Sequence, residues 1–357
     1  MVDPTIQADL FSQLIKFRLH PYVITGDIEK MYQQIHIKEE DRRFQRILWR
    51  ELTDEIVTYE LNTVTFGLAP APYLAVRTIH QLADDEGSEF PLAVNQLKRD
   101  LYVDDLLTGA STIEEMIQII RLLRRGGFHM RQFASNSPVI LEGLPDTSIN
   151  LRLYQKDHTL KTLGIYWNSL TDTIKFQPIK AHSKVPKRTI ASEIVKIFDP
   201  LRLVNPVVVQ AKLLMQYLWD LKLDWDKPVP LELNTKWLEF YSQLPELHNI
   251  EFKRFASQQN SSRIEVHGFC DANEAAYGAC LYLRSIDNAG KITTALLCSK
   301  SRVTPLKKKQ TIPRLELCAP SVLTNLYEMI KTDLHCSVDQ ITFWTDSSIV
   351  LHWINTA

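Results

Sequence analysis

Three aspartates in the first third of the sequence have the residue type and the setting that metal-dependent chemistry needs. Asp104 and Asp105 stand side by side between apolar neighbours, a pattern that predicts a tight hairpin with buried arms. Asp27 ends a short β-rich run that begins at Tyr22. Phosphoryl transfer uses two divalent cations about 4 Å apart, held by carboxylates on rigid neighbouring strands. Because carboxylates packed so closely repel one another unless a dication neutralises them, we expect these aspartates to form a two-metal site.

Three further acids lie at the ends of predicted elements in the last quarter of the chain. Asp271 ends a predicted strand, Glu316 lies one turn into a predicted helix, and Asp346 ends another strand. If these ends meet at one edge of a sheet, the three carboxylates can hold two metal ions for hydrolysis of a phosphodiester by water. Each acid taken singly could be a surface residue, and Asp346 could instead cap a helix that begins at Ser347-Ser348.

The elements that must position the first cluster alternate between strands and helices. Apolar and turn-forming patterns predict strands at 22–26, 44–49 and 56–61, a loop at 65–72 and a helix at 73–83. A second helix follows the aspartate hairpin. Ser111 and Glu114 form its expected capping box, and Gly126 is its expected stop.

The second half of the chain predicts a helical segment and then a different sheet. Asn205 and Pro206 indicate the N-cap and first residue of a helix that runs to about Leu221. The segment 224–259 has no clean periodicity, and we place a domain boundary in it near residue 255. The expected order after it is strand (264–269), strand (277–283), strand (293–298), helix (315–330) and strand (341–345).

The composition is that of a globular protein with more than one core. With 357 residues, 45% hydrophobic and 23% charged, the chain predicts two or three domains. The formal net charge of −1 excludes a generic polyanion binder, so a nucleic-acid groove would need local basic groups. The candidates are Arg121, Arg124, Arg125, Arg131, Lys184, Lys187, Arg188, Lys307, Lys308 and Lys309.

The absence of targeting signals and the spacing of the cysteines indicate where in the cell the protein is expected. No apolar run approaches the ~20 residues of a membrane span, and the N-terminus lacks the basic region of a secretory signal. We therefore expect an intracellular protein, cytoplasmic or nuclear or both, that is not secreted and has no membrane partner. The five cysteines contain no C-x₂-C pair, which favours buried reduced thiols over zinc ligands or disulfides.

The first acid cluster lies in a series of motifs that resembles the reverse transcriptase family. The motifs follow in the family's order at 26–35, 66–72, 102–105, 127–136 and 163–165, the last as primer grip. The resemblance implies that Asp27 and Asp104 bind Mg²⁺ or Mn²⁺ and that Asp105 supports them. It also implies that Tyr32 is an aromatic gate against a ribose 2′-hydroxyl, and that the template and the dNTP are contacted by Phe66, Gly67 and Tyr102.

Shorter stretches at 27–32, 198–201 and 211–216 look like the BEL/Pao group of LTR retrotransposons, in which a helical thumb and connection follow the palm. The second cluster is similar to the RNase H fold. Its motifs at 269–272, 313–317 and 343–348 carry Asp271, Glu316 and Asp346, so the resemblance implies that these acids are also catalytic metal ligands.

The resemblance implies an α/β (α+β) fold in three domains. These are a reverse transcriptase palm with partial fingers at 1–175, a helical thumb or connection at 176–255, and an RNase H-like βββαβ domain at 256–357. The implied function is that of an RNA-directed DNA polymerase from a retrotransposon, which adds dNTPs to a primer 3′-hydroxyl. The implied partners are an RNA or DNA template-primer, dNTPs and other parts of the parent polyprotein, namely protease and integrase.

Both ends fall short of the family pattern. The family carries a fourth acid on a last helix, whereas this chain ends eleven residues after Asp346, so we expect an incomplete RNase H-like domain. Only 26 residues precede Asp27, so we expect partial fingers, with Arg42 and Arg43 as candidates to grip the triphosphate.

Two other functions stay open. One is a catalytically inactive, element-derived relic that binds nucleic acid, against which the retained polymerase acids argue. The other is a retrotransposon aspartic peptidase, which we disfavour because neither Asp-Thr-Gly nor Asp-Ser-Gly occurs. Base stacking is also open for Trp219, Trp225 and Trp237, although we expect them to pack in a core.

Overall fold

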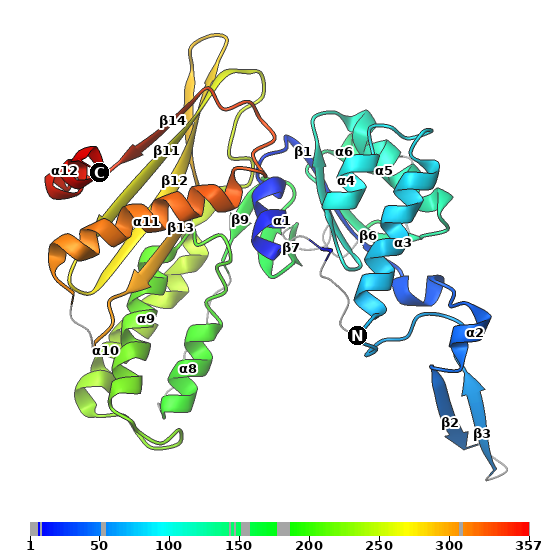
Figure 1. Ribbon diagram of the computed structural model, residues 1–357, viewed down its shortest axis with the longest axis horizontal. Coiled ribbons are helices and arrows are strands. Elements are labelled where there is room, and N and C mark those ends of the chain that lie inside the picture. Colours follow the sequence, from blue (N-terminus) through cyan, green and yellow to red (C-terminus); the bar gives the residue numbers. More distant parts are fainter. Residues whose placement is uncertain are drawn as a thin grey trace. The chain divides into compact units, whose positions relative to one another are not determined.

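The computed structural model describes residues 6–7, 9–50, 55–142, 144–145, 148–150, 158–176, 186–306 and 310–356 (Figure 1). It forms two compact units, one of Met1–Gln13 with His20–His158 and the other of Leu14–Leu19 with Thr159–Ala357. The candidate cations Lys184, Lys307, Lys308 and Lys309 lie outside the described residues. Within these ranges, no helix has the length and apolar character needed to span a bilayer.

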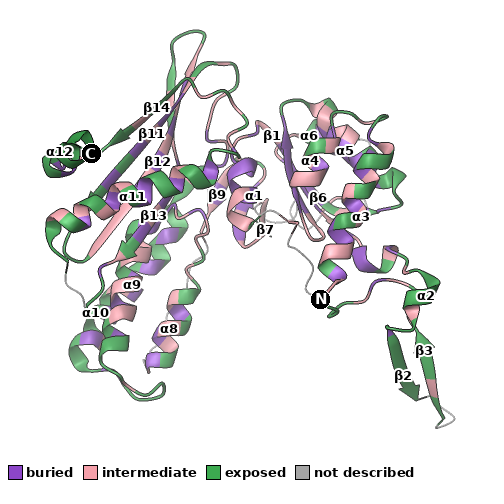
Figure 2. Ribbon diagram, viewed as in Figure 1, coloured by how far each residue is buried: buried purple, intermediate pink, exposed green. Residues whose placement is uncertain are grey.

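A four-stranded antiparallel sheet carries the first unit. Its order is β4-β5-β1-β6, so the strand that holds Asp27 lies inside the sheet. Its strands are β1 (Tyr22–Ile28), β4 (Leu101–Tyr102), β5 (Asp105–Ala110) and β6 (Met130–Ser135). Its helices are α3 (Ala71–Glu86), α4 (Val94–Arg99), α5 (Ile113–Arg125), α6 (Pro138–Leu141) and the short η1 (Met31–Gln34). The core joins Ile24 and Leu106 of the strands with Ile79 and Ile119 of the helices, all wholly buried. Figure 2 shows buried stretches along β1 and the helices of this unit.

Helix α5 confirms the helix expected after the hairpin, with its cap one residue later. The Thr112 side chain accepts a hydrogen bond from the backbone N–H of Glu115, and the Glu115 carboxylate accepts one from the N–H of Ser111. The capping box therefore starts at Thr112, and the prediction of Ser111 with Glu114 was wrong. Both positions carry a hydroxyl with a glutamate three residues on, so the sequence could not separate the two registers. The helix ends at Gly126 as expected.

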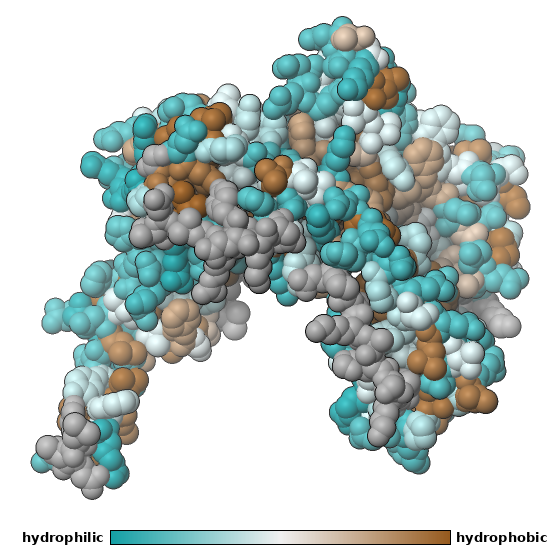
Figure 3. All heavy atoms as spheres, turned by 180° about the vertical axis from the view of Figure 1, so that it is seen from behind, coloured by the Kyte–Doolittle hydropathy of each residue, from teal (hydrophilic) through white to brown (hydrophobic). Residues whose placement is uncertain are grey.

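A two-stranded hairpin forms a small sheet of its own after the short helix α2 (Glu39–Arg42). Its strands are β2 (Arg46–Arg50) and β3 (Ile56–Glu60), so the first begins two residues later than expected. The large side chains of Phe44, Leu48 and Trp49 are exposed. Hydrophobic residues are visible along this hairpin at the lower left of Figure 3. An isolated hairpin has no third strand or helix against which to bury them.

The second unit contains a four-stranded sheet whose last strand comes from a distant part of the sequence. The strands β7 (Thr159–Thr162), β8 (Ile165–Asn168), β9 (Thr173–Lys175) and β10 (Glu251–Lys253) follow the order β10-β9-β8-β7. Residues 159–175 belong to the second compact unit, in which β9 pairs with β10. The division into functional domains at 1–175, 176–255 and 256–357 stays a prediction.

Helices fill the chain between β9 and β10. They are α8 (Lys187–Val195), α9 (Asn205–Asp220), α10 (Leu231–Gln243) and the short η3 (Leu244–Asn249). Trp237 is buried in their core, as expected. Trp219 and Trp225 are instead about half exposed and meet edge to face, with the Lys187 ammonium 4.1 Å from the Trp219 ring centroid. Their placement in a core was therefore wrong: Trp219 lies on an exposed side of α9, and Trp225 lies in the turn that follows this helix.

Helix α9 starts where expected but is capped differently. Its N-cap residue is Val204, and the backbone N–H groups of Leu203 and Val204 donate to the Asp199 carboxylate at 2.9 and 2.8 Å. The Asn205 amide oxygen instead accepts a hydrogen bond from Ser301 Oγ at 2.7 Å. The prediction of Asn205 as N-cap was wrong because this side chain is recruited by a strand almost a hundred residues away.

The last part of the chain has the expected βββαβ order. Its elements are β11 (Ser261–Ala272), β12 (Ala276–Asp287), β13 (Ile292–Val303), α11 (Ile312–Ile330), β14 (Gln340–Trp344) and a final helix, α12 (Ser348–Thr356). The sheet order is β13-β12-β11-β14, and β14 runs parallel to β11. Helix α11 packs closely on this sheet, since a Cβ on Gly268 would come within 2.6 Å of the Leu323 side chain. All five cysteines are free thiols, but only Cys270 and Cys298 are fully buried.

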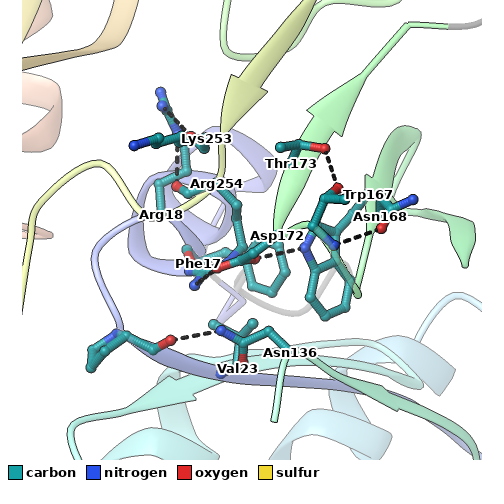
Figure 4. Close-up of polar contacts among 12 residues, drawn as sticks. Phe17, Arg18, Val23, Asn136, Trp167, Asn168, Asp172, Thr173, Lys253 and Arg254 are labelled. Atoms are coloured by element: carbon teal, nitrogen blue, oxygen red, sulfur yellow. Dashed lines mark hydrogen bonds and ion pairs between the residues drawn. The ribbon is translucent and has the colours of Figure 1, made fainter.

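Two buried arginines fix the end of α1 (Leu10–Phe17) within the second unit (Figure 4). Arg18 donates to the carbonyl oxygens of Lys253 and Leu297 at 3.0 and 2.7 Å. Arg254 pairs with both oxygens of Asp172 at 2.6 and 2.8 Å. Buried guanidinium groups need partners of this kind to offset their lost hydration. The segment that leads into β1 is therefore held by residues far along the chain.

Candidate active site

The first acid cluster is assembled by the backbone ladder of the first unit. Asp27 of β1 lies directly opposite Asp105 of β5, so their Cα atoms are about 4.5–5.5 Å apart. The backbone N–H of Ile28 donates to the carbonyl oxygen of Asp104 at 2.8 Å. Asp27 also lies opposite Arg131 of β6. Carboxylates and a guanidinium therefore form a row across three neighbouring strands.

The turn that carries Asp104 is strained. Val103 has a φ of 58°, in the left-handed region that a β-branched side chain rarely adopts. Such conformations cost on the order of 1–3 kcal/mol and persist only where the surrounding structure imposes them. Here the strands on either side, with Tyr102 paired to Asp105, impose a turn that presents two consecutive carboxylates.

Burial and neighbouring negative charges act together on the carboxylates of this cluster. Burial, and after it the neighbouring charges of Asp104 and Asp27, together raise the pKa of Asp105 to about 6. The guanidinium of Arg131 donates from Nε to Asp27 Oδ2 at 2.8 Å and lies 3.5 Å from Glu29. The sequence had identified Arg131 only as a basic residue of a groove. Its pairing with Asp27 was missed, because no local pattern reveals which strands become neighbours.

The expected substrate-contacting residues lie in the same unit. Tyr32 is buried, and its ring meets the Phe66 ring edge to face at 4.7 Å between centroids. Burial raises the pKa of Tyr32, and the charge of Asp104 adds to the increase. Phe66 itself is exposed, and Gly67 has a φ of 84° with open space where a Cβ would point. This loop therefore presents an open, aromatic-lined surface. The expected primer grip at 163–165 lies in the second unit, at the turn between β7 and β8.

The second acid cluster lies at one edge of the β11–β14 sheet. Phe269 and Trp344 are partners on these parallel strands, and Asp271 and Asp346 each follow two residues later. The side chain of Ser347 donates a hydrogen bond to the Glu316 carboxylate, which brings the third acid to this edge. The Cys270 thiol lies beside them: burial raises its pKa to about 11, and the charges of Asp271 and Asp346 contribute.

The capping of α12 bears on the two roles that the sequence left open for Asp346, namely metal ligand and helix N-cap. The Ser347 side chain accepts a hydrogen bond from the backbone N–H of Val350 at 3.3 Å, three residues into the helix. This is the geometry of an N-cap serine. Ser347, and not Asp346, therefore caps α12, and the Asp346 carboxylate is exposed.

Metal-ligand geometry is incomplete in both clusters as they stand. Among the residues that the structure describes, no group of three or more His, Cys, Asp or Glu side chains is arranged to hold a metal ion. One oxygen of Asp27 is engaged by Arg131, and one oxygen of Glu316 by Ser347. The donor chemistry itself, carboxylate oxygens alone, suits Mg²⁺ or Mn²⁺.

Comparisons with known proteins separate the chain into two matched regions. Residues 6–128 match the family described as reverse transcriptase (RNA-dependent DNA polymerase), and residues 186–347 match the Pao retrotransposon-like RNaseH-like domain. A search of curated proteins gave no match. The recognition and the fold class expected from the sequence are confirmed.

Solved structures of foamy viral proteins are similar to the chain. One is a protease-reverse transcriptase in complex with double-stranded DNA, at 14% identity and a TM-score of 0.52, covering 99% of this chain and 55% of that one. Another is the protease-reverse transcriptase with an RNA/DNA hybrid, at 14% identity and a TM-score of 0.48, covering 97% and 41%. This chain thus spans about half the length of the structures it matches, and the first likeness shows a shared fold. Residues 6–128 are therefore similar to the reverse transcriptase family, and residues 186–347 to the Pao retrotransposon-like RNaseH-like domain.

Proposed function

We propose that this chain is an RNA-directed DNA polymerase that adds dNTPs to the 3′-hydroxyl of a primer. The observation that carries the proposal is the pairing of Asp27 with Asp105 across β1 and β5, with Asp104 in the turn beside them, inside a reverse transcriptase domain. Polymerisation needs carboxylates on rigid neighbouring strands, and this ladder supplies them.

The carboxylates of Asp27 and Asp104 would hold two divalent cations, Mg²⁺ or Mn²⁺, with support from Asp105. The fit is supported by the pairing of Asp27 with Asp105 beside Asp104, since a dication would neutralise carboxylates that lie this close together. When bound, such cations lower the pKa of an attacking hydroxyl and neutralise a triphosphate. The protein's part is to orient the carboxylates through the strand ladder and to shape the pocket through Tyr32 and Phe66.

Tyr32 would act as the gate that excludes a ribose 2′-hydroxyl. Its ring is held by burial and by the edge-to-face contact with Phe66, so it cannot easily move aside. Gly67 and Tyr102 would contact the template or the incoming nucleotide. The template-primer is proposed as the macromolecular partner, and the similar foamy viral protein was solved with double-stranded DNA.

The wider setting is part of the same proposal. We expect the chain to be a segment of a retrotransposon polyprotein whose other parts include a protease and an integrase. Activity inside the cell, in the cytoplasm or the nucleus, stays a prediction from the sequence.

A second function is favoured by the shared edge of Asp271, Glu316 and Asp346. These acids would form an RNase H-type centre that cleaves the RNA strand of a hybrid. The proposal is supported by the register of β11 and β14, because Asp271 and Asp346 each lie two residues after the paired Phe269 and Trp344. Mn²⁺-dependent cleavage of a labelled RNA/DNA hybrid, lost in Asp271→Asn, would support it.

Primer extension tests the polymerase proposal directly. Purified protein with poly(rA)/oligo(dT), dTTP and Mg²⁺ should extend the primer, and Asp104→Asn should not. Asp84→Asn is the matched control, because Asp84 is a carboxylate of the same unit that pairs with Lys98. A wild-type protein that binds template-primer without extending it would favour the inactive relic.

A further inference from the structure

Arg131 is placed against Asp27 by an irregularity in strand β6. Between β1 and β6 the pairing is Thr25 with Ala134 and then Asp27 with Arg131, so β6 contains one extra residue at this point. Within that bulge Gln132 has a φ of 56°, a left-handed conformation unusual for a residue with a side chain. Bulges beside functional sites commonly re-aim a side chain.

Without the extra residue, Arg131 could not reach Asp27. Side chains alternate between the two faces of a sheet, so a shift of one residue moves each to the opposite face. In a regular ladder Gln132 would stand opposite Asp27, and Arg131 would point to the other face. The strained backbone at Gln132 is therefore part of the bulge that directs the Arg131 guanidinium toward Asp27, a candidate metal ligand.

The resulting ion pair is close but not locked. Arg131 Nε lies 2.8 Å from Asp27 Oδ2, and the Arg131 side chain is 43% exposed. A second carboxylate, Glu29, lies 3.5 Å from the same guanidinium. Arg131 can therefore leave Asp27 without losing all of its partners, because Glu29 and water remain available.

We propose that Arg131 is a displaceable counter-ion of Asp27, which competes with the divalent cation for this carboxylate and so sets the metal affinity of the site. The inference rests on the proposed polymerase function, since it takes Asp27 as a metal ligand. In the absence of metal the guanidinium offsets part of the negative charge of the cluster. Metal entry then requires exchange of one cation for another, with Arg131 moving toward Glu29.

Metal binding by the protein alone tests this role without any polymerase assay. We would measure the Mn²⁺ dissociation constant by electron paramagnetic resonance at about pH 8, without nucleic acid, for wild type, Arg131→Met and Arg131→Lys. Arg131→Met removes the charge and keeps an apolar stem, so Mn²⁺ should bind about two- to fivefold more tightly, as expected for loss of a partly exposed ion pair. Arg131→Lys should stay close to wild type.

Arg125→Met is the matched control. Arg125 pairs with Glu86 at 3.1 Å in the same unit, so its loss changes the net charge equally but leaves Asp27 untouched. If Arg131→Met binds Mn²⁺ no more tightly than Arg125→Met, the ion pair is purely structural and the inference fails. If Asp27→Asn leaves Mn²⁺ binding unchanged, the proposed metal site itself fails, which is a different outcome.

A measurement on the wild-type chain covers the case in which Arg131→Met does not fold. The side-chain Nε–H resonance of Arg131, assigned by its absence in Arg131→Lys, should shift toward that of a solvent-exposed arginine as Mg²⁺ is added. A resonance that stays unchanged at saturating Mg²⁺ would overturn the proposed exchange.

Discussion

The acid clusters of the two units are held in place in different ways. In the first unit, Asp27 and Asp105 are direct partners on antiparallel strands, so backbone hydrogen bonds fix their separation. In the second unit, Asp271 and Asp346 leave the ends of two parallel strands, and Glu316 joins them through the hydroxyl of Ser347. Burial, with a smaller contribution from the charges of Asp104 and Asp27, raises the pKa of Asp105 in the first cluster, whereas Asp271 and Asp346 are exposed to solvent.

This difference shows where each cluster is vulnerable. A ladder-held cluster is rigid, and its instability is electrostatic, so it should respond strongly to charge and to cations. A cluster at strand and helix ends depends on local capping and packing, so it should respond to changes in those contacts. The following variants test the contrast.

The largest effect should come from replacing a carboxylate of the first cluster with an amide, compared with the same replacement in the second cluster. Asp27→Asn should lower primer extension about 10³-fold, because several kcal/mol of transition-state stabilisation depend on the metal ligands. Asp271→Asn should leave extension within about twofold, since Asp271 belongs to the other unit. Steady-state extension rates measure both, and a large loss in Asp271→Asn would contradict the separation of the two centres.

A smaller effect is expected at the aromatic pair of the first unit. Tyr32→Ala should reduce the preference for dNTP over rNTP about 10- to 100-fold, the range that one missing steric contact commonly gives. Phe66→Ala should cause a weaker loss, because it only removes the ring that packs on Tyr32. The ratio of kcat/KM for the two nucleotides is the measurement. An unchanged ratio in Tyr32→Ala would exclude the gate.

The raised pKa of Asp105 predicts a pH dependence of stability without metal. Its pKa is about 6 in the folded protein against an ordinary value of 3.8, so the folded state binds the proton more tightly than the unfolded state. Stability should therefore fall as the pH rises from about 4 to about 6, by about 1 kcal/mol once solvent screening of this partly exposed group is considered. Urea unfolding in EDTA should show this decrease in wild type and not in Asp105→Asn. An equal decrease in both proteins would assign it to other groups.

An effect of similar size should be seen at the capping serine of the second cluster. Ser347→Ala removes the cap of α12 and the hydrogen bond to Glu316, and should cost about 1 kcal/mol of stability. Ser348→Ala, one residue on and exposed, is the control and should have little effect. Thermal unfolding of both variants provides the comparison. A larger loss in Asp346→Asn than in Ser347→Ala would restore Asp346 as the cap.

Most elements could be predicted because their signals are local. The β-rich run before Asp27 and the strand, helix and strand pattern around Glu316 both depend on neighbouring residue types, and both correspond to observed elements. Details that rest on one residue were less secure. The capping box starts at Thr112 and not at Ser111, because two equivalent hydroxyl–glutamate pairs overlap in the sequence. Asn205 does not cap α9, because its side chain accepts a hydrogen bond from Ser301.

Other features depended on contacts between distant segments. The burial of Trp237 and the exposure of Trp219 follow from which side of the helical layer each faces, and a helix with little clean periodicity does not reveal that side. The grouping of residues 159–175 with the second unit follows from the pairing of β9 with β10, more than seventy residues later.

By itself the sequence determined which residues could do chemistry and in what order they occur, because motif, polarity and periodicity are properties of short segments. It determined the two acid clusters and the family to which they are similar. Only the tertiary structure decided that Asp105 stands opposite Asp27, that a bulge at Gln132 turns Arg131 onto the same face, and that Ser347 reaches Glu316. The physical reason is that strand register and cross-strand neighbours are set by the packing of the whole sheet, which no local run of residues encodes.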